Sequence, residues 1–169
     1  YIFFIFVENN IEKLWKVVIL MKASECMCNN VCAIKPDLTI NKVAKLMGEK
    51  HIGCIPVCDD ENCICGIVTD RDLVLRTIAC EKDPKTTPVS EIMTCDVCTC
   101  KKDEEMSNVE SKMSQNQIRR IPVCDCNNHV VGILTLGDLA QNDKELGKQE
   151  VCTTISNICN CGTQTKNDQ

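Results

Sequence analysis

Aromatic residues, clusters of positive charge and long apolar runs are all scarce in this sequence. Three phenylalanines, one tyrosine and one tryptophan among 169 residues mean that any core is built from aliphatic side chains. The formal net charge is -5 and lysine and arginine form no continuous stripe, which argues against a nucleic-acid partner, since phosphate binding needs clustered positive charge. No apolar run approaches the roughly 20 residues that a membrane-spanning helix needs.

The rest of the composition is that of an ordinary globular protein. Apolar residues make up 44% of the chain and charged residues 25%, and 169 residues suffice for one good core or two small ones. Sixteen cysteines are many, but their spacing is irregular and the N-terminus lacks a clean signal peptide. This pattern favours free thiols in a reducing compartment, so the expected location is cytoplasmic.

Residues 1–20, YIFFIFVENNIEKLWKVVIL, stand apart from the rest of the chain. Two short apolar runs are separated by ENNIEK, a methionine occupies position 21, and a repeated unit begins just after it. We therefore expect residues 1–20 to be a non-native or misassigned extension. An amphipathic helix that binds a partner or a membrane surface is the alternative.

An internal duplication organises the remaining chain. SECMCNNVCAIKPD at 24–37 aligns with SEIMTCDVCTCKKD at 90–103, and HIGCIPVCDDENCICGIVTDRDL at 51–73 aligns with QIRRIPVCDCNNHVVGILTLGDL at 117–139, both at an offset of 66 residues. About two positions in five are identical over the whole aligned stretch, residues 24–73 against 90–139. We predict domains at 21–82 and 88–145, a C-terminal helix at 146–160 and a tail at 161–169.

Each copy shows a β-α-β-β-α pattern. In the first copy we expect strands over 31–35, 54–60 and 63–69, and helices over 38–51 and 70–80, with Thr39 as an N-cap. Since about 50 ordered residues bury too little apolar area alone, the copies should pack together. The predicted class is α/β (α+β), with two domains related by a pseudo-twofold axis. The expected apolar faces are Ile40, Val43, Leu46 and Met47; Leu73, Val74 and Ile78; and, in the second copy, Met106, Val109 and Met113.

The recurring motif Thr-x-x-Asp comes after an apolar run in both copies and has two interpretations. A threonine at a strand end and an aspartate three residues later can form a capping box at the start of a helix. Alternatively, the helix start offers backbone N–H groups to a phosphate while the carboxylate accepts hydrogen bonds from both hydroxyls of a ribose.

Both copies carry Ile-Pro-Val, an acidic turn, and then GIVTDRDL or GILTLGDL. This signature resembles the tandem cystathionine-β-synthase (CBS) domain pair, or Bateman module, of the stand-alone bacterial type, over about residues 24–140. The resemblance implies a regulatory module that binds AMP, ADP, ATP or S-adenosylmethionine in clefts between its domains and signals to a partner protein. It also implies a homodimer and no required cofactor, the nucleotide binding alone or together with Mg²⁺.

The resemblance assigns ligand contacts residue by residue. Thr69 and Thr135 fall in the ribose and phosphate region, and Asp72 and Asp138 fall at the ribose hydroxyls. Arg71, Arg120 and His51 are candidates to neutralise phosphates, with solvated surface charge as the equal alternative. Adenine would lie against the first strand and the Ile-Pro pair of each copy, at Val31, Ala33, Ile55, Pro56, Val97, Thr99, Ile121 and Pro122.

The cysteines are interpreted as packing residues. Cys26 aligns with Ile92 and Cys65 with Val131, so cysteine exchanges with aliphatic residues between the copies, as a small hydrophobic residue would. A redox-sensitive thiol or a zinc site is the alternative, with CDVC at 95–98 as one candidate pair, and we assign no metal ligands.

Catalysis is not expected. The sequence shows no paired nucleophile and base, no phosphate-cradling Walker loop and no paired metal ligands, so no residue is assigned a catalytic role. The function expected first is a nucleotide sensor, and a thiol or metal sensor is one alternative. The other alternative is an interaction scaffold that dimerises and whose nucleotide sites are vestigial.

Overall fold

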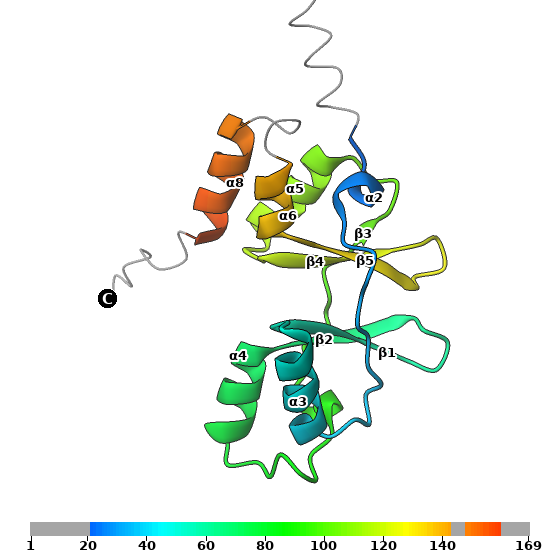
Figure 1. Ribbon diagram of the computed structural model, residues 1–169, viewed down its shortest axis with the longest axis vertical. Coiled ribbons are helices and arrows are strands. Elements are labelled where there is room, and N and C mark those ends of the chain that lie inside the picture. The colour runs from blue at the N-terminus through cyan, green and yellow to red at the C-terminus, as the bar shows by residue number, and fades with distance from the viewer. Residues whose placement is uncertain (1–20, 143–147, 160–169) are drawn as a thin grey trace, which may run out of the picture. The chain divides into compact units, whose positions relative to one another are not determined.

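The computed structural model describes residues 21–142 and 148–159, and these form two compact units. Unit 2 comprises residues 29–99 and 124–131, and unit 1 holds the other described residues. Both units contain strands and helices, so the predicted mixed α+β class is confirmed (Figure 1). The predicted extension at 1–20 and tail at 161–169 lie outside the described residues.

Unit 2 is built on an antiparallel hairpin of β1 (Cys54–Cys58) and β2 (Ile64–Thr69). The predicted strands over 54–60 and 63–69 are therefore confirmed within one or two residues. Helices α3 (Ile40–Lys50) and α4 (Asp70–Leu73) lie on one side of this hairpin (Figure 1). The hairpin and α3 share one aliphatic core with the short 3-10 helix η2 (Val89–Glu91).

Helix α3 agrees with the predicted pattern. Ile40, Val43 and Met47 are buried on one face at helical spacing, and Leu46 packs partly buried against the same core. The helix ends at His51, which adopts a left-handed φ of 54°. Thr39 occupies the N-cap position, but its side chain makes no capping hydrogen bond, so its predicted capping role is wrong.

The predicted strand over 31–35 is also wrong. Only Ile34 pairs with the sheet, through an isolated parallel bridge to Val57, in which Ile34 N–H donates to the Pro56 carbonyl at 3.1 Å. Pro36 comes two residues later and has no N–H to continue a ladder. In the second copy, the strand at this place, β3 (Cys100–Lys101), has two residues.

The second helix of the first copy differs from the predicted 70–80 helix. After α4 the chain widens into the π-helical segment η1 (Val74–Ile78), where Ala79 N–H donates to the Val74 carbonyl at 3.1 Å. Leu73 packs against the core as predicted. Val74 and Ile78 are exposed at 52% and 72%, so their predicted place on a core-facing surface is wrong.

Unit 1 contains a three-stranded sheet in the order β3-β4-β5, with β4 at Arg120–Cys124 and β5 at Val130–Thr135. The far ends of β4 and β5, residues 124–131, are grouped with unit 2. The helices are α2 (Ala23–Cys26), α5 (Met106–Gln115), α6 (Leu136–Gln141) and α8 (Lys148–Cys159). Met106, Val109 and Met113 of α5 are buried, as predicted.

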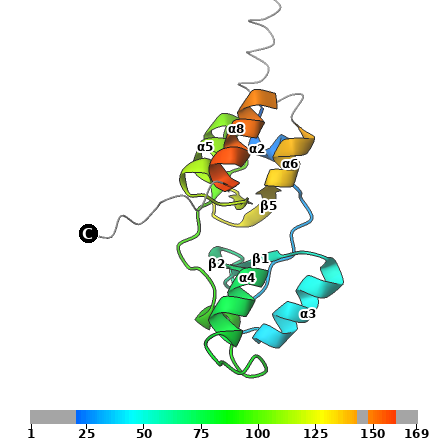
Figure 2. The ribbon, with the colours of Figure 1, turned by 90° about the vertical axis from the view of Figure 1, so that its left-hand side faces the viewer.

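Helix α8 packs against α5 and α6, and both views show the three helices side by side (Figures 1 and 2). Its Ile158 is buried, which anchors the helix on unit 1. Every helix within 21–142 and 148–159 is too short or too polar to cross a membrane.

The compact units do not coincide with the sequence repeats, because each unit takes in the leading segment of the other repeat. In unit 1, Cys28 from the first repeat bridges Ile133 of β5. In unit 2, Thr94 from the second repeat bridges Ile67 of β2 in the same way. Both bridges join positions that the 66-residue offset makes equivalent, so the exchange is a property of the duplication.

A glycine in each sheet makes room for these exchanged segments. A Cβ at Gly66 would lie 2.3 Å from the sulfur of Met93, and a Cβ at Gly132 would lie 2.2 Å from the sulfur of Met27. These distances are far below van der Waals contact, so the close packing of each methionine requires glycine opposite it. The glycine of the motif Gly-x-x-Thr-x-x-Asp therefore has a packing role.

We predict that Gly66→Ala lowers the free energy of unfolding by about 1–3 kcal/mol, since the added methyl group must displace Met93. The matched control is Gly48→Ala in α3, where a Cβ meets nothing within 4 Å and where the loss of glycine should stabilise the helix by about 0.5–1 kcal/mol. Urea unfolding of the two variants and the parent chain measures both effects. A Gly66→Ala variant as stable as the parent would contradict the packing role.

Candidate functional site

The Thr-x-x-Asp motif of the first copy forms a capping box where β2 passes into α4. Asp72 N–H donates to Thr69 Oγ1 at 3.3 Å, and Thr69 N–H donates to Asp72 Oδ2 at 2.9 Å. The Thr69 hydroxyl also donates to Asp72 Oδ2, at 2.7 Å. The capping interpretation is therefore confirmed, and the threonine holds the carboxylate in one orientation.

The second copy repeats this geometry in unit 1, where β5 passes into α6. Asp138 N–H donates to Thr135 Oγ1 at 3.3 Å, and Asp138 Oδ2 accepts from the Thr135 N–H at 2.8 Å and from its hydroxyl at 2.7 Å. The two boxes agree within 0.1 Å in each hydrogen bond. The chain thus presents two carboxylates held in the same way at equivalent strand ends.

The two carboxylates differ in their second oxygen. Asp72 Oδ1 forms an ion pair with Arg76 Nε at 3.4 Å, and Arg76 is itself fixed by donating Nη1 to the Ile92 carbonyl at 2.8 Å. The residue equivalent to Arg76 is Asn142, which donates to the backbone carbonyl of Asp138 at 2.8 Å rather than to its carboxylate. Among the described residues no lysine, arginine or histidine pairs with Asp138. Its Oδ1 therefore takes part in no ion pair with a described residue.

Several of the residues predicted to surround adenine are buried in the structure. Ile55 and Ile121 are fully buried in the cores, so their side chains are not available to a ligand. Pro56 and Pro122 are also buried, and the Pro56 carbonyl accepts from Ile34 N–H. The edge of β1 beside Pro56 is thus already occupied by the chain.

Several predicted residues of the first copy belong to unit 2, together with the first capping box. Asp70 N–H donates to the Gly53 carbonyl at 3.2 Å, which places the start of β1 beside Thr69. Val31 is half-buried and Ala33 exposed, just before the bridge of Ile34 to β1. Two predicted cations, Arg71 beside the box and His51 at the end of α3, are exposed.

Within unit 1, the corresponding hydrogen bond runs from Leu136 N–H to the Arg119 carbonyl at 3.1 Å. Arg120, the next residue and the first of β4, is half-buried and lies near Thr135. Val97 and Thr99, predicted to serve the second copy, belong to unit 2 instead.

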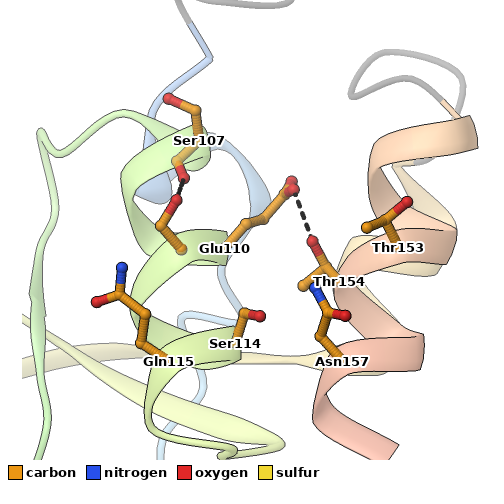
Figure 3. Close-up of a pocket in the computed structure, with 8 residues that line it drawn as sticks. Ser107, Glu110, Ser114, Gln115, Thr153, Thr154 and Asn157 are labelled. Carbon is orange, nitrogen blue, oxygen red and sulfur yellow. Dashed lines mark hydrogen bonds between the residues drawn. The ribbon is translucent and has the colours of Figure 1, made fainter.

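A polar groove that the sequence did not indicate lies between α5 and α8 (Figure 3). It has a volume of about 430 Å³, and the buried Glu110 accepts a hydrogen bond at its floor from Thr154 Oγ1 at 3.3 Å. None of the predicted ligand residues lines it. The sequence hints at this groove only through serines at helical spacing in α5. The same spacing is equally typical of a solvent-exposed helix face. The lining residues are Ser107, Glu110, Ser111, Ser114, Gln115, Thr153, Thr154 and Asn157.

The thiols near the hairpin ends are held in their protonated form. Burial is the main cause that raises the pKa of Cys58 to about 11, and the neighbouring Cys65 and Asp59 contribute to this rise. Burial and the Asp59 carboxylate also raise the pKa of the Cys65 thiol. No group of three or more possible metal ligands occurs among the described residues.

Comparison with known proteins places this geometry in a class of duplicated α+β modules. The sequence model of the CBS domain matches residues 23–77 and again residues 89–145. The chain therefore belongs to the CBS domain family, and neither match is to a catalytic domain.

Individual relatives cover most of the chain. It is similar to the CBS domain-containing protein YhcV of Bacillus subtilis (strain 168), with 35% identity over 139 residues, 82% of this chain and 96% of that protein. The crystal structure of Hypoxic Response Protein I with two coordinated zinc ions shares 29% identity at a TM-score of 0.66, covering 72% of this chain and 98% of that one. The CBS domain pair of protein MJ0100, solved in complex with 5'-methylthioadenosine and S-adenosyl-L-methionine, shares 27% identity at a TM-score of 0.64, covering 72% and 94%.

We predict that Cys58 resists alkylation at pH 8, because a thiol with a pKa of about 11 is ionised in only about one molecule in a thousand at that pH. Exposed Cys126 serves as the internal control and should be modified first. Mass spectrometry of peptides after iodoacetamide treatment, with and without urea, measures both sites. Modification of Cys58 at the rate of Cys126 in the folded protein would contradict the protonated, buried thiol.

Proposed function

We propose that this chain is a regulatory module that binds adenosine nucleotides or S-adenosylmethionine, with the two capping-box aspartates as acceptors for the ribose hydroxyls. The observation that carries the proposal is the paired, matched geometry of Thr69–Asp72 and Thr135–Asp138. Each threonine fixes its aspartate, so the carboxylate is already oriented before a ligand arrives. Preorganisation of this kind lowers the entropic cost of binding.

The chemistry of a carboxylate suits a ribose. An ionised carboxylate only accepts hydrogen bonds and has about four lone-pair sites, while a ribose offers two neighbouring hydroxyl donors. Asp138 Oδ2 uses two of these sites on Thr135, and Oδ1 remains for the sugar. Arg119 and Arg120, near the same box, supply positive charge for phosphates.

The two sites should differ in strength. A ribose at Asp72 has to compete with the Arg76 guanidinium for Oδ1, whereas a ribose at Asp138 meets no such competitor among the described residues. The second repeat is therefore the stronger site in this proposal. In the first repeat, Arg71 offers a charge for a phosphate where the second repeat has Gly137.

The bound adenosyl compounds of the MJ0100 domain pair support the ligand class. We further propose that the nucleotide binds alone or together with Mg²⁺, that the chain catalyses no reaction itself, and that it passes its signal to a partner protein from a cytoplasmic location. The nucleotide would produce this signal by binding one arrangement of the protein more tightly than another. We also propose that it acts as a homodimer.

Isothermal titration of the protein with AMP, ADP, ATP and S-adenosylmethionine in turn tests the function. Micromolar affinity for at least one of them, with the stoichiometry reporting how many sites are active, is the expected result. Absence of binding by all four would overturn the proposal and favour a scaffold with vestigial sites.

We predict that Asp138→Asn weakens binding of the titrating ligand by at least about tenfold, because a hydrogen bond to a charged acceptor is lost. Asparagine can still accept from Thr135 through its carbonyl oxygen, so the capping box and the fold are kept. Asp72→Asn should weaken binding less, since Asp72 is already paired with Arg76.

Asp103→Asn is the matched control for the change in charge, because Asp103 is exposed and lies outside both boxes. Its affinity should equal that of the parent chain. Equal affinities for Asp138→Asn and Asp103→Asn would rule out the ribose contact.

A further inference from the structure

The groove between α5 and α8 lies wholly within unit 1, and no residue of either capping box lines it. Its volume of about 430 Å³ falls in the range of about 300–1,000 Å³ that small-molecule pockets occupy. Most such pockets are mainly apolar, whereas the described lining residues here carry hydroxyls, side-chain amides and one carboxylate. The groove therefore suits a small polar ligand.

The carboxylate of Glu110 decides which polar ligand fits. Glu110 is 8% exposed, and its Oε2 accepts from Thr154 Oγ1 at 3.3 Å. Figure 3 shows this side chain reaching from α5 toward α8 across the groove. An ionised carboxylate has about four acceptor sites, so it can take a donor from a ligand even where the chain supplies a further donor. Because burial of a carboxylate is costly unless a cation or several donors meet it, a cationic donor suits this position best.

The walls of the groove add neutral hydrogen-bonding groups. Ser114 and Gln115 contribute from α5, and Thr153 and Asn157 contribute from α8 (Figure 3). Hydroxyls and side-chain amides both donate and accept, so they can bind the hydroxyl groups of a ligand. A phosphate, by contrast, would meet the negative charge of Glu110 with no described lining residue of positive charge to offset it. The groove is thus unsuited to the nucleotides of the proposed function.

The first repeat shows that the shared fold does not require these groups. In α3, the helix equivalent to α5, Ala44 occupies the position of Glu110 and Lys45 that of Ser111. Ala44 is exposed, whereas Glu110 is buried. The carboxylate and the hydroxyls beside it therefore belong to the repeat whose helix packs against α8. A reason for them has to be sought in the groove itself.

We infer that this groove binds a small hydroxylated amine, an amino sugar or an amino alcohol, with its ammonium group at Glu110 and its hydroxyls along the two helices. A hydrogen bond between an ammonium and a carboxylate is stronger than one between neutral groups, and it offsets the burial of the charge. The residues on both walls then select for a ligand with several hydroxyls. This site lies outside the two ribose sites of the proposed function and is independent of them.

The first test is a nuclear magnetic resonance titration of the full ¹⁵N-labelled chain with glucosamine, with ethanolamine as the smaller amine. We expect the amide signals of Ser111 and Thr154 to shift and to saturate at millimolar concentration. Glucose is the matched probe, since it has a hydroxyl where glucosamine has its ammonium, and it should bind at least about tenfold more weakly. Absence of a saturable shift with both amines overturns the site, and equal affinities for glucose and glucosamine overturn the contact with Glu110.

The second test removes the charge and keeps the shape. In Glu110→Gln the amide oxygen can still accept from Thr154, so α8 stays on α5, while the affinity for glucosamine should fall at least about tenfold and approach that for glucose. Glu49→Gln is the matched control, because Glu49 is exposed on α3 at the position equivalent to Gln115, and it should bind glucosamine as the parent chain does. An unchanged affinity in Glu110→Gln, or an equal loss for both sugars, overturns recognition of the ammonium by the carboxylate.

The third test fills the groove without a change in charge. Ser111 lines the groove and is exposed, so Ser111→Leu should abolish glucosamine binding by occupying the space of the ligand. Asn108→Leu is the matched control, since Asn108 is exposed on the same helix but does not line the groove. Glucosamine binding that survives Ser111→Leu would place the site elsewhere and overturn the inference.

Titration of Glu110→Gln with the nucleotides separates this inference from the proposed function. The substitution touches neither capping box, so nucleotide affinity should equal that of the parent chain. A parent chain that binds glucosamine in the groove and binds no nucleotide keeps the amine site and loses the proposed function. The opposite result, nucleotide binding without a saturable response to either amine, keeps the function and overturns the amine site.

Discussion

The hydrogen bonds between threonine and aspartate at the two strand ends are the interactions on which both candidate sites depend. Each set closes a strand, starts a helix and fixes a carboxylate, all through three hydrogen bonds of 2.7–3.3 Å. A structural role and a binding role are therefore compatible in one motif. The box engages Oδ2 of each aspartate and leaves Oδ1 to interact elsewhere, with Arg76 in one repeat and with no described cation in the other.

Much of the fold could be predicted from the sequence because the duplication provided an internal control. The hairpin strands, α3 and the buried face of α5 could be inferred from apolar spacing that recurs at the fixed offset. The predictions failed where the backbone departs from regular strand or α-helical geometry. Ile34 alone reaches the sheet because Pro36 ends the pairing, and the widened π turn at 74–78 leaves Val74 and Ile78 outside the core.

The candidate site was predicted in part. The capping interpretation of Thr-x-x-Asp needed only local sequence, since its partners are three residues apart. The ion pair of Asp72 with Arg76 could have been suspected from their helical spacing, yet its anchor at Ile92 comes from the exchanged segment and is invisible in local sequence. The same exchange gives the motif glycines their packing role against Met27 and Met93. Duplication has thus preserved the box and changed the charges around it.

The most direct measurement of the central claim is a nuclear magnetic resonance titration of the ¹⁵N-labelled protein with the adenosyl ligand. The amides of Thr69 and Thr135 donate directly to the two carboxylates. Their chemical shifts should therefore change when a ligand donates a further hydrogen bond to either carboxylate. The account predicts that the Thr135 and Asp138 amides shift first and those of Thr69 and Asp72 at higher ligand concentration. Shifts confined to the groove between α5 and α8, with all four of these amides unmoved, would contradict it.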